Sequence, residues 1–174
     1  MAESNLVNKW TRDKAVDKTT LGAKLPAYPN EFMVKLFAST YYSNLAAGFI
    51  QSGQKVLDVG CGAANNLRFF VDRGLEGHGI DVTDDFVEMA LENVKQLGYL
   101  AKIQRGSNEQ IPYEDNFFDI LISINTIHYQ EGREAYIRAL REFSRVVKPG
   151  GLVVFSTVGM QHEFRTHSKR EQEF

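Results

Sequence analysis

A short apolar run that ends in an acid and a glycine turn most constrains what this chain can fold into. Residues 56–59 read Val-Leu-Asp-Val, Gly60-Cys61-Gly62 follows, and a helical pattern opens at Leu67. A strand, a glycine turn and a helix in this order are typical of the start of a βαβ unit. Glycines at such a turn let a ligand reach backbone N–H groups, because no Cβ stands in the way. On these residues alone, a tight turn without a ligand is an equal alternative.

The acid at position 58 indicates which ligand the turn would take. A dinucleotide loop presents a helix N-terminus to a pyrophosphate, and a buried carboxylate beside it would repel that anion. Asp58 suits instead a ligand with an ammonium or sulfonium group. The dinucleotide fingerprint also needs a glycine at position 65, where the chain has Asn65. A nicotinamide-dependent oxidoreductase therefore stays an alternative, but a disfavoured one.

Length and charge set the broad class of protein. The 174 residues are enough for one domain with a single core, and 43% of them are hydrophobic, as in ordinary globular proteins. A net charge of −2 gives no overall attraction to nucleic acid or to anionic membranes. Cys61 is the single cysteine, so no internal disulfide can form, and we expect it to fill space in the turn rather than to catalyse. With no run long enough to span a bilayer and no signal-peptide pattern, we expect a cytoplasmic protein.

Strand and helix patterns alternate along the chain. Asn30 and Thr83 stand where helix N-caps are expected. Such alternation predicts an α/β, Rossmann-like fold, with a mostly parallel sheet and helices on both faces. The expected helices cover residues 31–40, 41–50, 66–73, 84–97 and 133–147, and the expected strands cover residues 55–59, 77–81, 99–104, 117–123 and 152–157.

Four segments would meet at the carboxyl edge of this sheet, where ligands bind in open parallel sheets. They are Asp58 with its glycine loop, Asp81 at the end of the second strand, residues 107–110, and residues 123–125. An acid in the position of Asp81 can accept hydrogen bonds from both hydroxyls of a ribose. Its alternative role is to cap the following helix.

With these pieces in place, the chain resembles a class I S-adenosylmethionine-dependent methyltransferase of the small-molecule type. The resemblance covers about residues 54–157, in the family's order and near its usual spacing. The matching segments are Val56–Gly62, Gly79-Ile80-Asp81, Ile111–Ser123 and Lys148-Pro149-Gly150-Gly151.

The resemblance implies a role for each matching residue and S-adenosylmethionine as the cofactor. Asp58 and Gly60, with Gly62 in the same loop, would hold the amino-acid end of the cofactor, and Ser123 would offer its carbonyl near the methionine moiety. Asp81 would bind the ribose hydroxyls. Val82 would pack on the adenine, and Asn108 would present its backbone N–H to the adenine ring. It implies no metal and no nucleophilic side chain, because the methyl donor is already activated.

The chain also departs from the family pattern. The third loop glycine falls at Ala64, whose methyl group should narrow the space beside the cofactor, and an acid common in the family is replaced by Ser107. The two C-terminal antiparallel strands are missing, so we expect either a native chain that continues past Phe174 or an oligomer through the exposed sheet edge. We expect residues 1–52 to form a helical lid and residues 53–174 the cofactor-binding domain.

The methyl acceptor is harder to predict. Tyr28, Phe32, Tyr41 and Tyr42 are expected walls of an acceptor site in the lid, and Asn125 is a further substrate candidate. His128 could act as a general base, although a packing role is the stronger alternative. Asn125 lacks the Pro-Pro-aromatic sequence of amino-methylating DNA enzymes, so we expect a small-molecule acceptor and no nucleic acid. A catalytically silent domain of the same fold remains an alternative. Asp119, within a strand, is expected to be structural.

Overall fold

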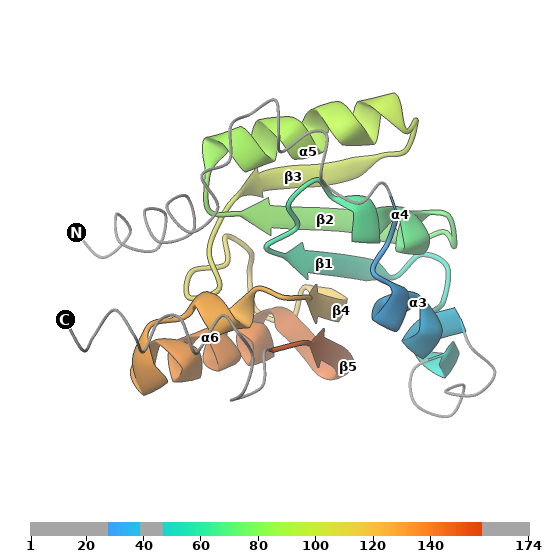
Figure 1. Ribbon diagram of the computed structural model, residues 1–174. Coiled ribbons are helices and arrows are strands. Elements are labelled where there is room, and N and C mark those ends of the chain that lie inside the picture. Colours follow the sequence, from blue (N-terminus) through green and yellow to red (C-terminus); the bar gives the residue numbers. More distant parts are fainter. Residues whose placement is uncertain (1–27, 39–46, 158–174) are drawn as a thin grey trace.

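The computed structural model describes residues 28–38 and 47–157, and these form one parallel sheet with helices on both faces. Figure 1 shows the strands side by side in the order β3-β2-β1-β4-β5, and every neighbouring pair is parallel. The strands are β1 (Lys55–Val59), β2 (Glu76–Asp81), β3 (Ala101–Arg105), β4 (Phe118–Ser123) and β5 (Val147–Phe155). The expected fold class is confirmed.

The helices divide between the two faces because the alternating strand residues are apolar on both sides. Met33 and Phe37 of α3 pack with Leu67 and Phe70 of α4 against one face, which α5 also covers. On the other face, Phe143 and its neighbours on α6 pack against the sheet. The helical elements are α3 (Glu31–Ala38), α4 (Asn65–Val71), α5 (Asp84–Gln96) and α6 (Gly132–Val146), with short 3₁₀ turns η1 (Ala47–Phe49) and η2 (Ile127–Tyr129).

Two of the helices begin at the caps that the sequence predicts. The Asn30 side chain accepts hydrogen bonds from the N–H groups of Phe32 and Met33 at the start of α3. The Thr83 hydroxyl accepts one from the N–H of Phe86 at the start of α5. These caps satisfy backbone donors that a helix leaves unpaired, and they fix where each helix starts.

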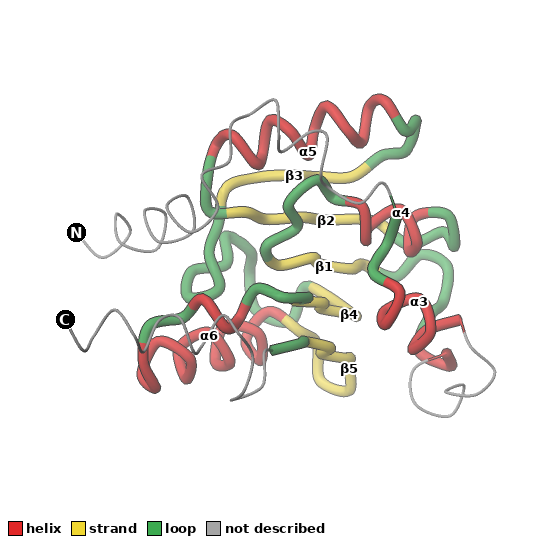
Figure 2. Tube along the Cα trace, viewed as in Figure 1, coloured by secondary structure: helices red, strands yellow, loops and turns green. Residues whose placement is uncertain are grey.

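The strand order places a switch point between β1 and β4. From β1 the chain passes to β2 and β3 in one direction, and it then returns to place β4 on the other side of β1. The chain after β1 leads to α4 on one face and the chain after β4 leads to α6 on the other, which opens a crevice at the carboxyl edge. Figure 2 shows these connections as green segments that run from the strand ends to the helices.

The opposite edge of the sheet is braced by Asp119, which the sequence analysis assigns to structure. Its Oδ2 accepts the backbone N–H of Lys55 at 2.9 Å, and its Oδ1 accepts Lys148 Nζ at 2.8 Å. Burial by itself would raise the pKa of Asp119, but the bonds from Lys148 and Lys55 outweigh it and hold the pKa below its usual value. One carboxylate thus ties together the beginnings of β1, β4 and β5.

Some element boundaries differ from the expectation. The strand expected to start at Tyr99 starts at Ala101, and β5 begins at Val147, before the Lys-Pro-Gly-Gly segment that was expected to separate helix from strand. That segment is accommodated as a shift of register between Phe118 and Ile120 of β4, with Gly150 at a φ of +79°. Of the expected helix 41–50, only η1 lies in the described residues.

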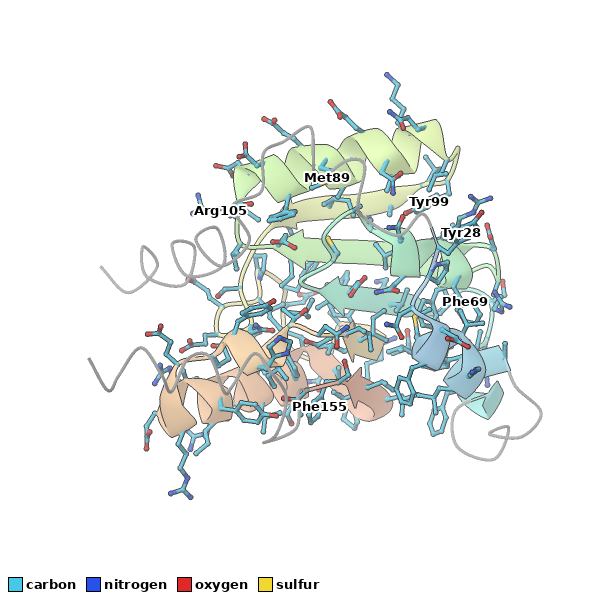
Figure 3. All side chains as sticks on the ribbon, in the orientation of Figure 1. Tyr28, Phe69, Met89, Tyr99, Arg105 and Phe155 are labelled. Atoms are coloured by element: carbon cyan, nitrogen blue, oxygen red, sulfur yellow. The ribbon has the colours of Figure 1, made fainter. Side chains whose placement is uncertain are left out.

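In the described sheet β5 is an edge strand, and Phe155 near its end, labelled in Figure 3, is 39% exposed. No helix among the described ranges is both long and apolar enough to cross a membrane. The division at residue 52 stays a prediction, since the structure describes only residues 28–38 and 47–52 of the proposed lid.

Candidate functional site

A cavity of about 530 Å³ opens at the carboxyl edge of the sheet, beside the switch point. The volume lies within the range of small-molecule sites, about 300–1,000 Å³. Five segments line it: the start of α3 with the residues before it (28–31), the turn after β1 and the first residues of α4 (59–66), the end of β2 and the start of α5 (81–86), the loop after β3 (106–109) and the loop after β4 (124–130). The four edge segments expected from the sequence are brought together, and the start of α3 joins them.

The two glycines of the turn do different things. Gly60 has a φ of +72°, and a Cβ there would overlap the side chain of Thr126 from the loop after β4. Gly62 has a φ of +53°, lines the cavity, and would place a Cβ in open space. Gly60 therefore allows two loops to touch, while Gly62 keeps the floor of the cavity free.

Asp81 lines the cavity with a carboxylate that backbone donors hold in place. Its Oδ2 accepts the N–H of Gly62 at 2.9 Å and its Oδ1 accepts the N–H of Val82 at 2.8 Å. Burial raises the pKa of Asp81, and these two bonds oppose the rise. The helix cap is Thr83, so Asp81 does not perform the capping role considered as its alternative. Val82 lies beside it as a cavity wall.

Asp58 is almost fully buried at the carboxyl end of β1 and lies behind the lining residues. Its Oδ2 accepts the side-chain amide of Asn66 at 3.4 Å, whereas Oδ1 has no hydrogen-bond partner among the described residues. Burial raises the pKa of Asp58 to about 7, and repulsion from Asp81 adds to the rise. A positively charged ligand beside these two buried acids would stabilise their ionised forms, so the site favours such a ligand.

Two further side-chain oxygens at the cavity have no hydrogen-bond donor among the described residues. The side-chain oxygens of Asn108 and Gln130 are buried, and no described residue gives either of them a hydrogen bond. Glu31, Asp81 and Glu109 line the cavity, but none of the lining residues within the described ranges is Lys, Arg or His. The walls therefore fit a ligand that donates hydrogen bonds and is neutral or positively charged.

The loop that carries Asn108 is fastened to α6 by one guanidinium. Arg145 donates to the carbonyls of Ile111 and Tyr113 and to the carboxylates of Asp115 and Glu142. The Glu142 carboxylate also accepts the N–H of Ile111 at 2.9 Å. The contacts with Glu142 and Asp115 raise the pKa of Arg145 further above its usual value, so its charge is permanent.

Not every residue predicted for the site reaches it. Ser123 is fully buried and does not line the cavity, and its carbonyl already accepts the N–H of Ser156 at 3.0 Å. The cavity wall is made instead by the three residues that follow it. His128 also lies off the wall, beside Tyr129, with the ring centroids 4.3 Å apart. The two residues that follow it, Tyr129 and Gln130, line the cavity.

Of the residues expected to contact the acceptor, some line the cavity and others do not. Tyr28 and Asn125 line the cavity. Phe32 is exposed and not part of the wall, while Tyr41 and Tyr42 lie outside the described residues. Cys61 lines the cavity, and burial raises the pKa of its thiol well above the usual value, which keeps the thiol protonated and agrees with a filling role.

Ala64 does not narrow the cavity as expected, because it is fully buried and off the wall. It adopts the left-handed conformation, with φ 59°, at the start of α4. Its carbonyl accepts the hydroxyl of Tyr99, labelled in Figure 3, at 2.6 Å. The methyl group of Ala64 therefore strains the left-handed backbone and takes no space from the cavity.

Asn66 and Gln130 line the cavity although the sequence did not point to them as site residues. Asn66 lines the cavity and bonds both to Asp58 and to the backbone of Asn30. The available signal was an asparagine in the first turn of the helix after the glycine loop, where its short amide can reach both neighbouring segments. For Gln130 the only signal was its position in the loop after the fourth strand.

Comparison with known proteins identifies the family. The family model described as "Methyltransferase domain" matches residues 57–155, more than half of the chain. A Mus musculus protein named "Probable tRNA methyltransferase 9B" is 31% identical over 119 residues, which cover 68% of this chain and 25% of that protein. The demethylmenaquinone methyltransferase of Bacillus pumilus is 34% identical over 110 residues, which cover 60% of this chain and 45% of that protein. The chain thus spans less than half the length of these curated relatives.

Solved structures show the same fold. A SAM dependent methyltransferase from Aquifex aeolicus is 25% identical with a TM-score of 0.57, over 77% of this chain and 69% of that one. A structure from Methanococcus maripaludis covers 90% of this chain and 70% of that one, with a TM-score of 0.61 and 23% identity, which supports the fold alone. The chain therefore belongs to the methyltransferase domain family and has the fold of class I S-adenosylmethionine-dependent methyltransferases.

Proposed function

We propose that the chain transfers a methyl group from S-adenosylmethionine to a small, uncharged or cationic acceptor. The observation that carries the acceptor class is the lining of the cavity, in which no described residue is basic and Asp81 is an acid. Two further lining acids, Glu31 and Glu109, form ion pairs with Lys35 and Arg138. A polyanion such as tRNA needs Lys and Arg contacts to its phosphates. This wall therefore supports a small molecule in preference to the tRNA named for one set of relatives.

The residues of the cavity fit the cofactor. Asp81 keeps lone pairs free for ribose hydroxyls, and Val82 offers an apolar surface to the adenine. The unpartnered oxygen of Asp58 can balance the ammonium of the amino-acid end, and that of Asn108 can accept an amino group. Gly62 leaves the space in which the cofactor would lie against the backbone. Gly60 lines the cavity next to Gly62, whereas Ser123 lies behind the wall.

The cofactor, when bound, supplies a methyl group already activated by the neighbouring sulfonium charge. The protein then has to align the acceptor and exclude water. The segment of residues 28–31 and the loop of residues 124–130 both line the cavity, and we expect them to contact the acceptor. Asn125 and the buried oxygen of Gln130 can receive hydrogen bonds from an acceptor hydroxyl or amine, which would orient its nucleophilic atom. His128 lies off this wall, so we expect His128→Ala to keep most of the activity.

Two measurements test the proposal. Calorimetry should detect binding of S-adenosylhomocysteine and none of NAD, which separates a methyltransferase from a nicotinamide enzyme. A turnover screen should compare small alcohols, phenols and amines with bulk tRNA as acceptors. Methylation of tRNA alone would refute the acceptor class while keeping the cofactor. Binding of S-adenosylhomocysteine with no turnover of any acceptor class would favour a silent binding domain.

A further inference from the structure

The side chain of Asn66 joins two parts of the site that the sequence separates. Its Oδ1 accepts the backbone N–H of Asn30 at 2.9 Å, and its Nδ2 donates to Oδ2 of Asp58 at 3.4 Å. Asn30 in turn caps α3, and the residues around it line the cavity. A single amide therefore connects the buried acid at the end of β1 to the start of the N-terminal helix.

The orientation of this amide is dictated by its partners. A backbone N–H can only donate, so Oδ1 of Asn66 must face Asn30. Nδ2 then faces Asp58, which is the favourable arrangement when the carboxylate is ionised. A protonated Asp58 is a weaker acceptor for Nδ2, and its O–H could compete for Oδ1, so its hold on the amide is weaker than that of the carboxylate. The charge of Asp58 therefore sets how firmly the contact with α3 is held.

We propose that Asn66 is a positioning residue that links the cofactor's amino-acid end, through Asp58, to the docking of the segment Tyr28–Glu31 at the cavity. A positive group near Asp58 stabilises the ionised carboxylate, the ionised carboxylate orients the amide, and the amide holds the start of α3. Because coupling between two sites is reciprocal, the docked segment also strengthens cofactor binding. The inference rests on the proposed function in that the cofactor is the ligand beside Asp58.

The electrostatic surroundings of Asp58 support this link. Burial and the charge of Asp81 raise the pKa of Asp58 to about 7, and the bond from Asn66 lowers it. Cys61 and Tyr99 are the other titratable groups that interact with Asp58, and burial raises the pKa of both, so both stay neutral near pH 7. Asp58 is thus half ionised near neutrality in the free protein, and a cationic ligand can shift it.

The test uses two nucleosides that differ at the amino-acid end. S-adenosylhomocysteine carries the ammonium and 5′-methylthioadenosine does not. We expect Asn66→Ala to weaken S-adenosylhomocysteine by about tenfold or more, as for loss of a hydrogen bond to a charged group, and to leave 5′-methylthioadenosine within about threefold. The matched control is Asn65→Ala, which also lines the cavity but bonds to Asn93 of α5. Asn65→Ala should change the affinities for the two ligands by similar factors.

A second readout follows the start of α3. Hydrogen exchange of the amides of Asn30, Phe32 and Met33 should slow by about threefold or more when wild type binds S-adenosylhomocysteine, the equivalent of one hydrogen bond. It should not slow with 5′-methylthioadenosine, or in Asn66→Ala with either ligand. The wild-type affinity for S-adenosylhomocysteine should rise as pH increases through about 7, and Asn66→Ala should move this midpoint to higher pH.

The outcomes separate the two proposals. If wild type binds neither nucleoside, the proposed function fails and the inference with it. If wild type binds S-adenosylhomocysteine but Asn66→Ala weakens both ligands equally, or keeps the ligand-dependent protection of α3, only the inference fails. Should Asn66→Ala not fold, Asp58→Asn decides, because it keeps the shape and removes the charge. It should abolish both the pH dependence and the protection of α3, and retention of either would refute the link.

Discussion

At the scale of single residues, the turn after β1 shows two glycines that look alike in sequence and differ in environment. A Cβ on Gly60 would strike Thr126, whereas a Cβ on Gly62 would enter the cavity. We expect Gly62→Ala to bind S-adenosylhomocysteine at least about tenfold more weakly, with a loss of stability limited to left-handed strain of about 1–2 kcal/mol.

Gly60→Ala is the matched comparison for that variant. It carries the same left-handed strain and adds an overlap with Thr126, so it should lower the melting temperature more than Gly62→Ala does. Calorimetry and thermal melts on the same two proteins give both readouts. Equal melting temperatures for the two variants would contradict the assignment of Gly60 to loop packing.

The burial of Asp58 lowers the free energy of unfolding at neutral and higher pH. Its pKa of about 7 in the fold lies above the ordinary value of 3.8, so the folded state holds a proton that the unfolded state releases. Its contribution to stability is therefore complete below about pH 4 and is lost as pH rises through 7. We expect Asp58→Asn to raise the free energy of unfolding at pH 8, by an upper limit of about 4 kcal/mol, and by less at pH 5. Denaturant titrations at both pH values, without ligand, measure this. A gain independent of pH would show that ionisation is not its source.

At the scale of elements, one arginine holds the loop after β3 against α6. Arg145 donates to four acceptors, and two of them are backbone carbonyls. The carbonyl of Ile111 also accepts the N–H of Tyr113, whereas no other described residue is shown to donate to the carbonyl of Tyr113. We expect Arg145→Ala to lower the free energy of unfolding by about 2–4 kcal/mol and to weaken S-adenosylhomocysteine, since Asn108 lies in the same loop. Denaturant unfolding and calorimetry measure the two effects.

Arg145→Lys is the informative control for this clamp. Lysine keeps the charge but lacks the planar fork that reaches several acceptors at once, so we expect it to restore only part of the lost stability. Arg138→Ala is a second control. Arg138 lies on the same helix and pairs with Glu109 in a more exposed position, where an ion pair contributes about 1 kcal/mol or less.

Most elements could be predicted from the sequence because their signals are local. Asn30 and Thr83 cap helices as expected, and the apolar period places β1 at the predicted residues. The sequence is silent where a distant contact decides. Nothing near Ser123 in the sequence indicates that its carbonyl is taken by Ser156, and nothing near Gly60 indicates Thr126.

In the candidate site too, some features could be predicted from the sequence and others could not. The edge that gathers Asp81, Val82 and Asn108 follows from the parallel sheet, whose strands all end on the same side and which the alternation predicts. Which face of a short 3₁₀ turn meets the cavity does not follow, so the sequence selected His128 while the structure places Tyr129 and Gln130 at the wall. A turn of three residues has too little periodicity to reveal its buried side.

At the scale of the whole molecule, the sheet presents β5 as an edge within the described residues. Residues 152–154 of this strand are half-buried and Phe155 is exposed. Such an edge invites pairing with another chain. We expect light scattering to give a mass above that of the 19.7 kDa monomer as concentration rises, and we expect Phe155→Lys to reduce the association.

The control for association lies at the far side of the sheet. Leu100 precedes β3 and is more exposed than Phe155, so Leu100→Lys removes exposed apolar surface without touching β5. It should leave the measured mass unchanged. A chain that stays monomeric at every concentration would contradict pairing through β5.

The brace around Asp119 has a consequence for how such an enzyme can diversify. It joins the beginnings of three strands, whereas the loop of residues 124–130, which lines the cavity, follows the opposite end of β4. Substitutions in that loop therefore do not disturb the contacts that hold the strand beginnings together. Loop exchange between family members is a practical route to new acceptors on this framework, with melting temperature as the early check that the framework is intact.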